Sequence, residues 1–330
     1  MAILIRLEPT PLTWGIDAGR HGEQARLRNC ALAAPEQATG ETVEVGLATD
    51  QGPAPVGLTT IIEPSKGWAR LGLKELWQYR ELLYFLTWKN ILIRYKQAVL
   101  GIAWAILNPV LTMVVFTVVF NKLLGVGSGA YGVPYAVFAF TGLLPWNLFS
   151  GSLAAAGASL VGNANLITKV YFPRLVIPAS AVLGAVPDFL LGLLVLAALM
   201  AVYGVVPPWQ VVTLPLFVLL ALATALGVAL WLSALYVLYR DVQYVIPFLV
   251  QLWFFVSPVT YPTSKIPKGW PSVIYNLNPM TGVIGGFRWA LLGETAPGTL
   301  FWLSAAMVVV VFVTGLYYFR RMERLFADVV

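Results

Sequence analysis

Six long apolar runs constrain this chain more than any other feature of its sequence. They cover roughly residues 98–121, 134–158, 176–203, 209–238, 242–260 and 299–319. Each run is close to the ~20 residues that an α-helix needs to cross the hydrocarbon core of a bilayer. Backbone groups in lipid must be paired within the segment, so such runs fold as helices. The sequence therefore predicts an all-α polytopic membrane protein with six transmembrane helices, in keeping with 59% hydrophobic and 11% charged residues.

The chain divides into three parts by composition. In residues 1–65 acidic residues outnumber basic ones, and Gly, Pro, Thr and Ala are frequent. Apolar content is too low there for a core, so we predict a polar, acidic cytosolic tail that is mostly disordered. Residues 66–97 form a second part, and residues 98–330 form the transmembrane domain.

Residues 66–97 carry apolar and aromatic side chains at spacings of three and four, which is typical of an amphipathic helix. Basic residues are frequent in the same stretch, and its aromatic side chains suit the headgroup level of a bilayer. We therefore predict an interfacial helix on the cytosolic surface. Its candidate membrane-contacting residues are Trp77, Arg80, Tyr84 and Trp88.

The distribution of basic residues predicts the orientation of the chain. If every second loop is cytosolic, most Lys and Arg residues fall on the cytosolic side. The predicted outer loops hold only Lys122, Lys265, Lys268 and Arg288. We predict a multi-pass protein of the inner (plasma) membrane with both termini in the cytosol. The net charge of +6 then reflects topology, and no nucleic-acid partner is expected.

The connection between the second and third runs, residues 163–178, alternates polar and bulky side chains with basic ones. This pattern favours a short amphipathic helix at the cytosolic surface that docks onto something outside the bilayer. The alternative is a simple turn whose Lys and Arg only set topology. The candidate docking residues are Leu166, Lys169, Tyr171, Phe172, Pro173 and Arg174.

The stretch between the fifth and sixth runs, about 261–298, is too long for a turn. It holds two short apolar pieces, Trp270–Leu277 and Met280–Leu292, on either side of Asn278-Pro279. Neither piece can cross a bilayer, so we predict a re-entrant helical hairpin that dips in from the periplasmic side. Arg288 is expected at headgroup depth. The alternative is an ordinary periplasmic loop with an isolated Arg.

Several chemistries are not supported. Cys30 and His21 are the single residues of their types, which argues against a disulfide, and no metal site is predicted. The glycine-rich stretch 125–129 lacks the Lys-Ser/Thr of a P-loop, so we expect no nucleotide cofactor on this chain. Asp188 is the one carboxylate well inside an apolar run, too little for a proton-coupled carrier or an enzyme site. We interpret it as a carboxylate bonded to a neighbouring helix or to water.

Prolines and aromatic residues remain as candidates for a channel. Pro109, Pro145, Pro187, Pro247 and Pro258 interrupt four of the runs and are expected to break or kink those helices. Aromatic side chains on the first and fifth runs suit stacking on sugar rings in a wide pore, or alternatively face lipid or fill the bundle. The candidate channel residues are Trp104, Phe116, Trp253, Phe254 and Tyr261.

Five motifs occur in the order of a known family. They read W-Q-Y-R-E-L-L-Y-F-L-T-W-K-N-I-L-I-R-Y-K-Q-A-V-L-G-I-A-W-A-I-L-N-P, N-L-I-T-K-V-Y-F-P-R-L-V-I-P, Y-R-D-V, F-F-V-S-P-V-T-Y-P and N-L-N-P-M. From about Trp68 to its end the chain resembles the permease (type-2 exporter membrane subunit) of polysaccharide-export ABC transporters. These export O-antigen, capsule or teichoic acid chains on a lipid pyrophosphate.

The resemblance implies a homodimer with two copies of a separate ATPase subunit, which binds ATP and Mg²⁺. It implies that 163–175 is the coupling helix, that 68–90 is the interface helix and that 270–292 forms the periplasmic gate. The gate residues are then Asn278, Pro279 and Arg288, with Arg288 placed to meet the pyrophosphate. The function implied is export of a lipid-linked polysaccharide. Alternatives are a small-molecule or drug exporter of the same superfamily or, with no paired carboxylates or His/Asp site in support, a membrane-bound glycosyl- or acyltransferase.

Overall fold

The computed structural model describes residues 77–96, 101–123, 133–262, 269–294, 296, 298–323 and 326. All of them belong to one compact unit, Pro64–Val330. The predicted tail 1–65 and the first part of the predicted interfacial helix lie outside the described residues, as do Lys265 and Lys268.

Every regular element in the described residues is helical. The helices are α3 Arg80–Lys96, α4 Gly101–Phe116 with its π-helical extension Thr117–Leu123, α5 Tyr135–Gly157, α6 Ser159–Gly162, α7 Ala164–Lys169, α8 Val176–Leu183, α9 Val186–Val202, the 3₁₀-helix η3 Trp209–Thr213, α10 Leu214–Leu238, α11 Val242–Val256, α12 Trp270–Asn276, α13 Pro279–Leu292 and α14 Leu300–Met322. The prediction of an all-helical fold is confirmed for this part of the chain.

Five helical stretches are long and apolar enough to cross a membrane. They are Ala103–Phe120, Tyr135–Gly157, Val176–Val202, Trp209–Leu238 and Leu300–Met322. The fifth predicted run forms only α11, which has 15 residues and is followed by the non-helical residues 257–262. The predicted count of six spans therefore has one member that is short for a complete crossing.

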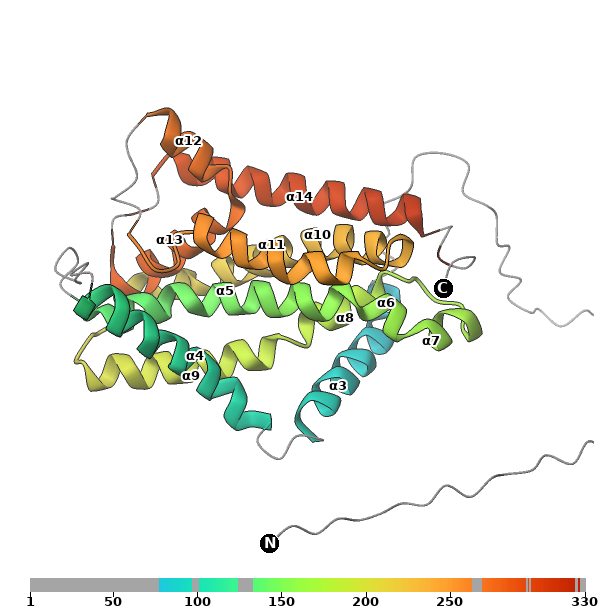
Figure 1. Cartoon of the computed structure of the whole chain (residues 1–330), viewed down its shortest axis with the longest axis horizontal. Helices are drawn as coiled ribbons and strands as arrows, with labels where there is room; N and C mark the ends of the chain where they lie inside the picture. Colours follow the sequence, from blue (N-terminus) through green and yellow to red (C-terminus); the bar gives the residue numbers. More distant parts are fainter. Residues whose placement is uncertain are drawn as a thin grey trace, which may run out of the picture. The chain divides into compact units, whose positions relative to one another are not determined.

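Helix α5 is the centre of the bundle. It packs against α4, α8, α9, α10, α11 and α13, and 83% of the residues in its most apolar stretch are buried. Helix α4 lies obliquely across one side of α5. Helix α14 packs on the side of α10 that faces away from α5 (Figure 1). By contrast, only 6% of the residues of Ala103–Phe120, which includes most of α4, are buried. One side of α4 and one side of α11 consequently remain uncovered.

Small residues bring α10 and α14 together. A Cβ atom added at Gly315 would lie 2.2 Å from the backbone oxygen of Gly227. Next to this contact Trp231 stacks on Tyr318, with ring centroids 4.1 Å apart. Glycine permits this backbone approach because any larger residue would push the helices apart.

The prolines affect their helices differently. Pro109, Pro145 and Pro247 lie inside continuous helices, so the predicted breaks at these positions are wrong. An internal proline removes one backbone hydrogen bond, which neighbouring helices can tolerate. The third run is broken as predicted, since α8 ends at Leu183 and α9 begins at Val186, next to Pro187.

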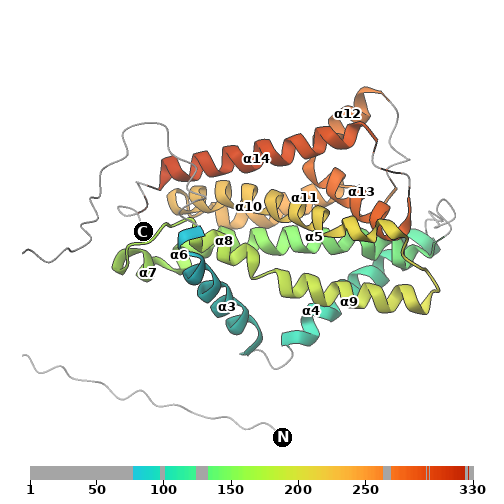
Figure 2. The same cartoon turned by 180° about the vertical axis from the view of Figure 1, so that it is seen from behind.

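The two segments that interrupt the apolar runs lie at opposite ends of the bundle. Figures 1 and 2 both place α6 and α7 beside the end of α14, whereas α12 and α13 lie at the other end. That the two segments face opposite sides of a membrane stays a prediction.

Candidate functional site

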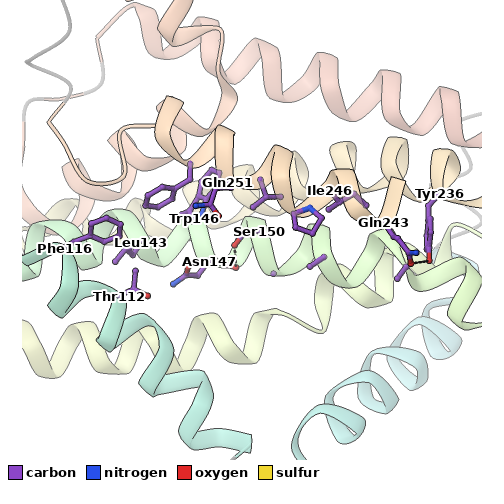
Figure 3. Close-up of a pocket in the computed structure, with 16 residues that line it drawn as sticks. Thr112, Phe116, Leu143, Trp146, Asn147, Ser150, Tyr236, Gln243, Ile246 and Gln251 are labelled. Atoms are coloured by element: carbon purple, nitrogen blue, oxygen red, sulfur yellow. Dashed lines mark hydrogen bonds between the residues drawn. The ribbon is translucent and has the colours of Figure 1, made fainter. Parts of the chain in front are cut away.

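A cavity of about 610 Å³ lies between α4, α5 and α11 (Figure 3). One part of its wall is aromatic. Phe116 of α4 and Phe254 of α11 stack with their centroids 5.6 Å apart, and Trp146 of α5 meets Phe254 edge-on at 5.4 Å. Three helices thus meet at this ring cluster, which is buried at Trp146 and partly exposed at Phe116 and Phe254.

The other part of the wall carries amides and hydroxyls. Asn147 and Ser150 come from α5, and Gln243 and Gln251 come from α11. The Tyr236 hydroxyl donates a 2.8 Å hydrogen bond to Oε1 of Gln243. Amide groups at membrane depth are costly unless they bind water, one another or a ligand. Rings beside amides suit a ligand that has both hydroxyl groups and apolar faces.

A second cavity of about 260 Å³ lies on the other side of α4. Trp104 and Asn108 of α4 line it together with Asp188 of α9. Asn147 and Ser150 line both cavities, so α4 separates two spaces that share one polar stretch of α5.

The predicted channel aromatics fall into two groups. Phe116 and Phe254 line the larger cavity, and Trp104 lines the smaller one. Trp253 and Tyr261 line neither: the Trp253 indole donates to Asn278 at 2.9 Å, and the Tyr261 hydroxyl meets that of Tyr275. These two side chains bond to Asn278 and Tyr275, so they attach the hairpin to α11 and to the segment that follows it.

Sequence reasoning missed the polar lining. Asn147, Ser150 and Gln251 were not among the candidates, nor was Trp146. A usable signal existed, because isolated amides and hydroxyls inside apolar runs are expensive and mark functional positions.

The hairpin exists as two helices, α12 and α13, joined at Asn278. The Asn278 side chain accepts a 3.0 Å hydrogen bond from the Met280 amide and caps α13. Its amide group also donates to the Ser257 hydroxyl at 2.9 Å. One side chain therefore joins the hairpin to the segment that follows α11, while Pro279 begins α13.

Arg288 is buried in this structure, whereas an accessible position was expected. Its side chain is 1% exposed, and its guanidinium lies 3.8 Å from the centre of the Phe138 ring. It donates to the backbone oxygens of Val259 at 2.8 Å and Tyr261 at 3.1 Å. The physical reason is that residues 257–262 are not helical, so their carbonyl groups need donors from elsewhere. In this arrangement the guanidinium is enclosed by the protein.

The candidate docking segment presents only part of its predicted set. Residues 164–169 form the short helix α7, as predicted. Lys169 at its end and Tyr171 after it are exposed, Tyr171 by 83%. Phe172 is buried in a small core with Leu175 and Phe319. Leu166, Pro173 and Arg174 are half-buried.

Arg174 also points inward. Its guanidinium donates to the backbone oxygen of Glu323 at the end of α14, and its amide donates to the Glu323 carboxylate at 3.1 Å. Phe172 and Arg174, both expected to dock on a partner, thus make intramolecular contacts in this structure. Apolar burial holds Phe172, and hydrogen bonds to Glu323 hold Arg174.

Helix α3 is amphipathic. Trp77, Tyr84 and Trp88 are exposed, and the Arg80 guanidinium lies 5.6 Å from the centre of the Trp77 ring. Leu86 on the other side is buried in the small core that also holds Phe172.

The interpretation of Asp188 as a carboxylate bonded to a neighbouring helix is confirmed. Arg94 and Tyr95, both on α3, donate to its two oxygens. Among the described residues no cluster of His, Cys, Asp and Glu has the composition of a metal site.

Comparison with known proteins gives a consistent result. Residues 81–292 match the family model described as ABC-2 type transporter. The chain is 34% identical over 255 residues to the O-antigen export system permease protein RfbA of Myxococcus xanthus, covering 76% of this chain and 96% of that protein. It is 30% identical over 251 residues to the RfbA protein of Klebsiella pneumoniae, covering 76% and 95%. It is 24% identical over 242 residues to the polysialic acid transport protein KpsM of Escherichia coli, covering 71% and 91%.

Proposed function

This chain belongs to the family of ABC-2 type transporters, and we propose that it is the membrane-spanning permease of an exporter for a lipid-linked, O-antigen-like polysaccharide. Export would be driven by a separate ATPase subunit. The observation that carries the proposal is the 610 Å³ cavity with aromatic rings on one side and amides on the other. Sugars present hydroxyl groups at their edges and C–H groups on their faces, which matches both kinds of lining.

We propose a homodimer in the inner membrane with both termini in the cytosol. The two helices that line the cavity with α5 also carry exposed apolar residues, namely Leu111 and Val115 on α4 and Phe248 and Leu252 on α11. A second copy placed there would cover apolar surface and enclose the two cavities in one passage. The six-span topology then counts α11 together with residues 257–262 and the hairpin as the fifth crossing.

We place the ATPase contact at the α7 end of the bundle. Of the candidate docking residues, Lys169 and Tyr171 are exposed, and they would supply a cation and a large ring to a partner surface. Phe172 would anchor the segment from inside, so that a push on Tyr171 reaches the bundle. Tyr84 and Trp88 of α3, and Trp77 just before it, would rest in the headgroup layer.

The function is tested with the permease and its ATPase reconstituted in proteoliposomes containing the lipid-linked polymer. We expect ATP-dependent transfer of polymer to the opposite leaflet. Phe254→Leu should lower this transfer by roughly three- to ten-fold, since one aromatic contact is worth about 0.5–1.5 kcal/mol. The control is Leu219→Ala, an exposed apolar residue of α10 that lines neither cavity and lies outside the proposed dimer surface.

Two outcomes would contradict the proposal. Equal transfer by wild type and Phe254→Leu would remove the cavity from the path. Transport of a small lipophilic dye without any polymer would support a small-molecule exporter instead.

The contact surface has its own test in the same preparation. Tyr171→Ala should leave the folded permease intact but weaken its binding to the ATPase, because the ring is 83% exposed. Phe172→Ala should instead lower stability by about 3–5 kcal/mol, the usual cost of emptying a buried aromatic site. Binding is measured by co-purification and stability by thermal unfolding. Unchanged ATPase binding in Tyr171→Ala would rule out this contact.

A further inference from the structure

The third apolar run contains a bend point between α8 and α9. Helix α8 ends at Leu183, and Gly184 and Ala185 separate it from α9. Pro187 has no N–H, so it cannot bond to the carbonyl of Leu183 four residues earlier. The run therefore lacks a regular hydrogen-bond ladder at this point, which makes it the softest place along the third run.

Helix α3 is bonded to the third run on both sides of this bend. On the α8 side, the Asn90 side chain donates to the Ser180 hydroxyl at 3.3 Å. At the bend, the Arg94 guanidinium lies 3.5 Å from the backbone oxygen of Gly184. On the α9 side, Arg94 and Tyr95 both donate to the Asp188 carboxylate. One helix thus spans the bend and holds both of its arms.

The cluster of Arg94, Tyr95 and Asp188, called the clamp below, is well suited to change shape. The Arg94 and Asp188 side chains are 36% and 34% exposed, and an ion pair in such a setting typically contributes about 0–1 kcal/mol. Burial and the hydrogen bond to Asp188 raise the pKa of Tyr95, which keeps its hydroxyl protonated as a donor. The three hydrogen bonds of Arg94 and Tyr95 therefore position α3 against the bend, yet each can break at low cost in free energy.

The clamp lies between the two functional regions. Helix α8 begins directly after residues 170–175, which hold the exposed Tyr171 and the buried Phe172. On its other side, Asp188 lines the smaller cavity with Trp104. A displacement of residues 170–175 must pass through α8, and it can then either bend the third run or slide α8 along α3.

We propose that the clamp positions α3 across the α8–α9 bend, so that displacement of residues 170–175 bends the third run at Gly184 and reshapes the cavities beside α4. Arg94, Tyr95 and Asp188 are positioning residues in this scheme, and none of them needs to touch the transported molecule. The inference rests on the proposed function and adds the element that converts an ATPase movement into a change of the passage.

The test uses the complete permease–ATPase complex in proteoliposomes and measures ATP hydrolysis and polymer transfer together. Asp188→Asn, Arg94→Gln and the milder Tyr95→Phe should hydrolyse ATP at close to the wild-type rate. Polymer moved per ATP should fall, by about ten-fold for the two charge variants, in the usual range of coupling between sites. Asp241→Asn, the same change at an exposed turn, should behave as wild type.

A charge exchange separates positioning from simple packing. The double variant Arg94→Asp with Asp188→Arg restores an ion pair across the same two positions, and it should recover most of the polymer moved per ATP. A structural role alone would change protein yield and ATP hydrolysis in parallel with transfer. Unchanged coupling in the single variants, or no recovery in a folded double variant, would overturn the clamp. Failure of the wild-type complex to move polymer would instead overturn the proposed function.

Discussion

Replacing Arg288 by Met gives a direct measure of how the hairpin is held. The substitution keeps the length of the side chain but removes donors to two backbone oxygens, at 2.8 and 3.1 Å. Each buried carbonyl left without a partner costs about 1–3 kcal/mol. Losing the contact with the Phe138 ring costs about 1–2 kcal/mol more. Removing a buried charge returns part of this, so the net loss should be about 2–4 kcal/mol.

The assay is thermal unfolding of the purified permease in detergent, followed by tryptophan fluorescence. A loss of this size should lower Tm by roughly 5–15 °C, taking about 2–4 °C for each kcal/mol. Arg288→Lys should lie between Met and wild type, because an ammonium lacks the planar fork that reaches two oxygens. Arg240→Met, at an exposed turn, is the control. A Tm for Arg288→Met equal to that of the control would refute the idea that this guanidinium replaces missing helix hydrogen bonds.

Two further predictions concern stability. Gly315→Ala should destabilise the permease by about 1–3 kcal/mol, since its Cβ would lie 2.2 Å from a backbone oxygen of α10. The control Gly285→Ala should not, because a Cβ there meets no atom within 4 Å. Equal effects of the two variants on Tm would contradict the close α10–α14 contact. Burial raises the pKa of Glu294, although the nearby charge of Arg288 acts in the opposite direction. The folded protein therefore binds the carboxyl proton more tightly than the unfolded chain does. It loses stability as the pH rises through the pKa of the folded state. Glu294→Gln should therefore raise Tm over wild type more at alkaline than at acidic pH, and a pH-independent difference would contradict the assignment.

The sequence predicted what depends on local pattern. The apolar runs located the helices of the bundle to within a few residues, and Asn278-Pro279 located the turn of the hairpin. These features follow from hydrophobic length and from the backbone limits of proline, which a single segment already contains.

Tertiary contacts decided what the sequence could not predict. Phe172 and Arg174 look like a docking pair beside Tyr171, but their direction depends on Phe319 and Glu323 near the other end of the chain. Period and composition carry no record of such partners. The cavity was missed for the same reason, because its amides and rings come from three helices that only the fold brings together.

The shortness of α11 has a consequence for the surrounding lipid. Fifteen helical residues rise only ~22 Å along the helix axis, against ~30 Å of hydrocarbon in a typical bilayer. Residues 257–262, which follow α11, are not helical, so the bilayer next to α11 should thin to match the short helix. Lipids with shorter acyl chains would then fit this side best. The hydrocarbon layer would then be thinnest beside the hairpin, and a transported molecule leaving there would cross the least lipid.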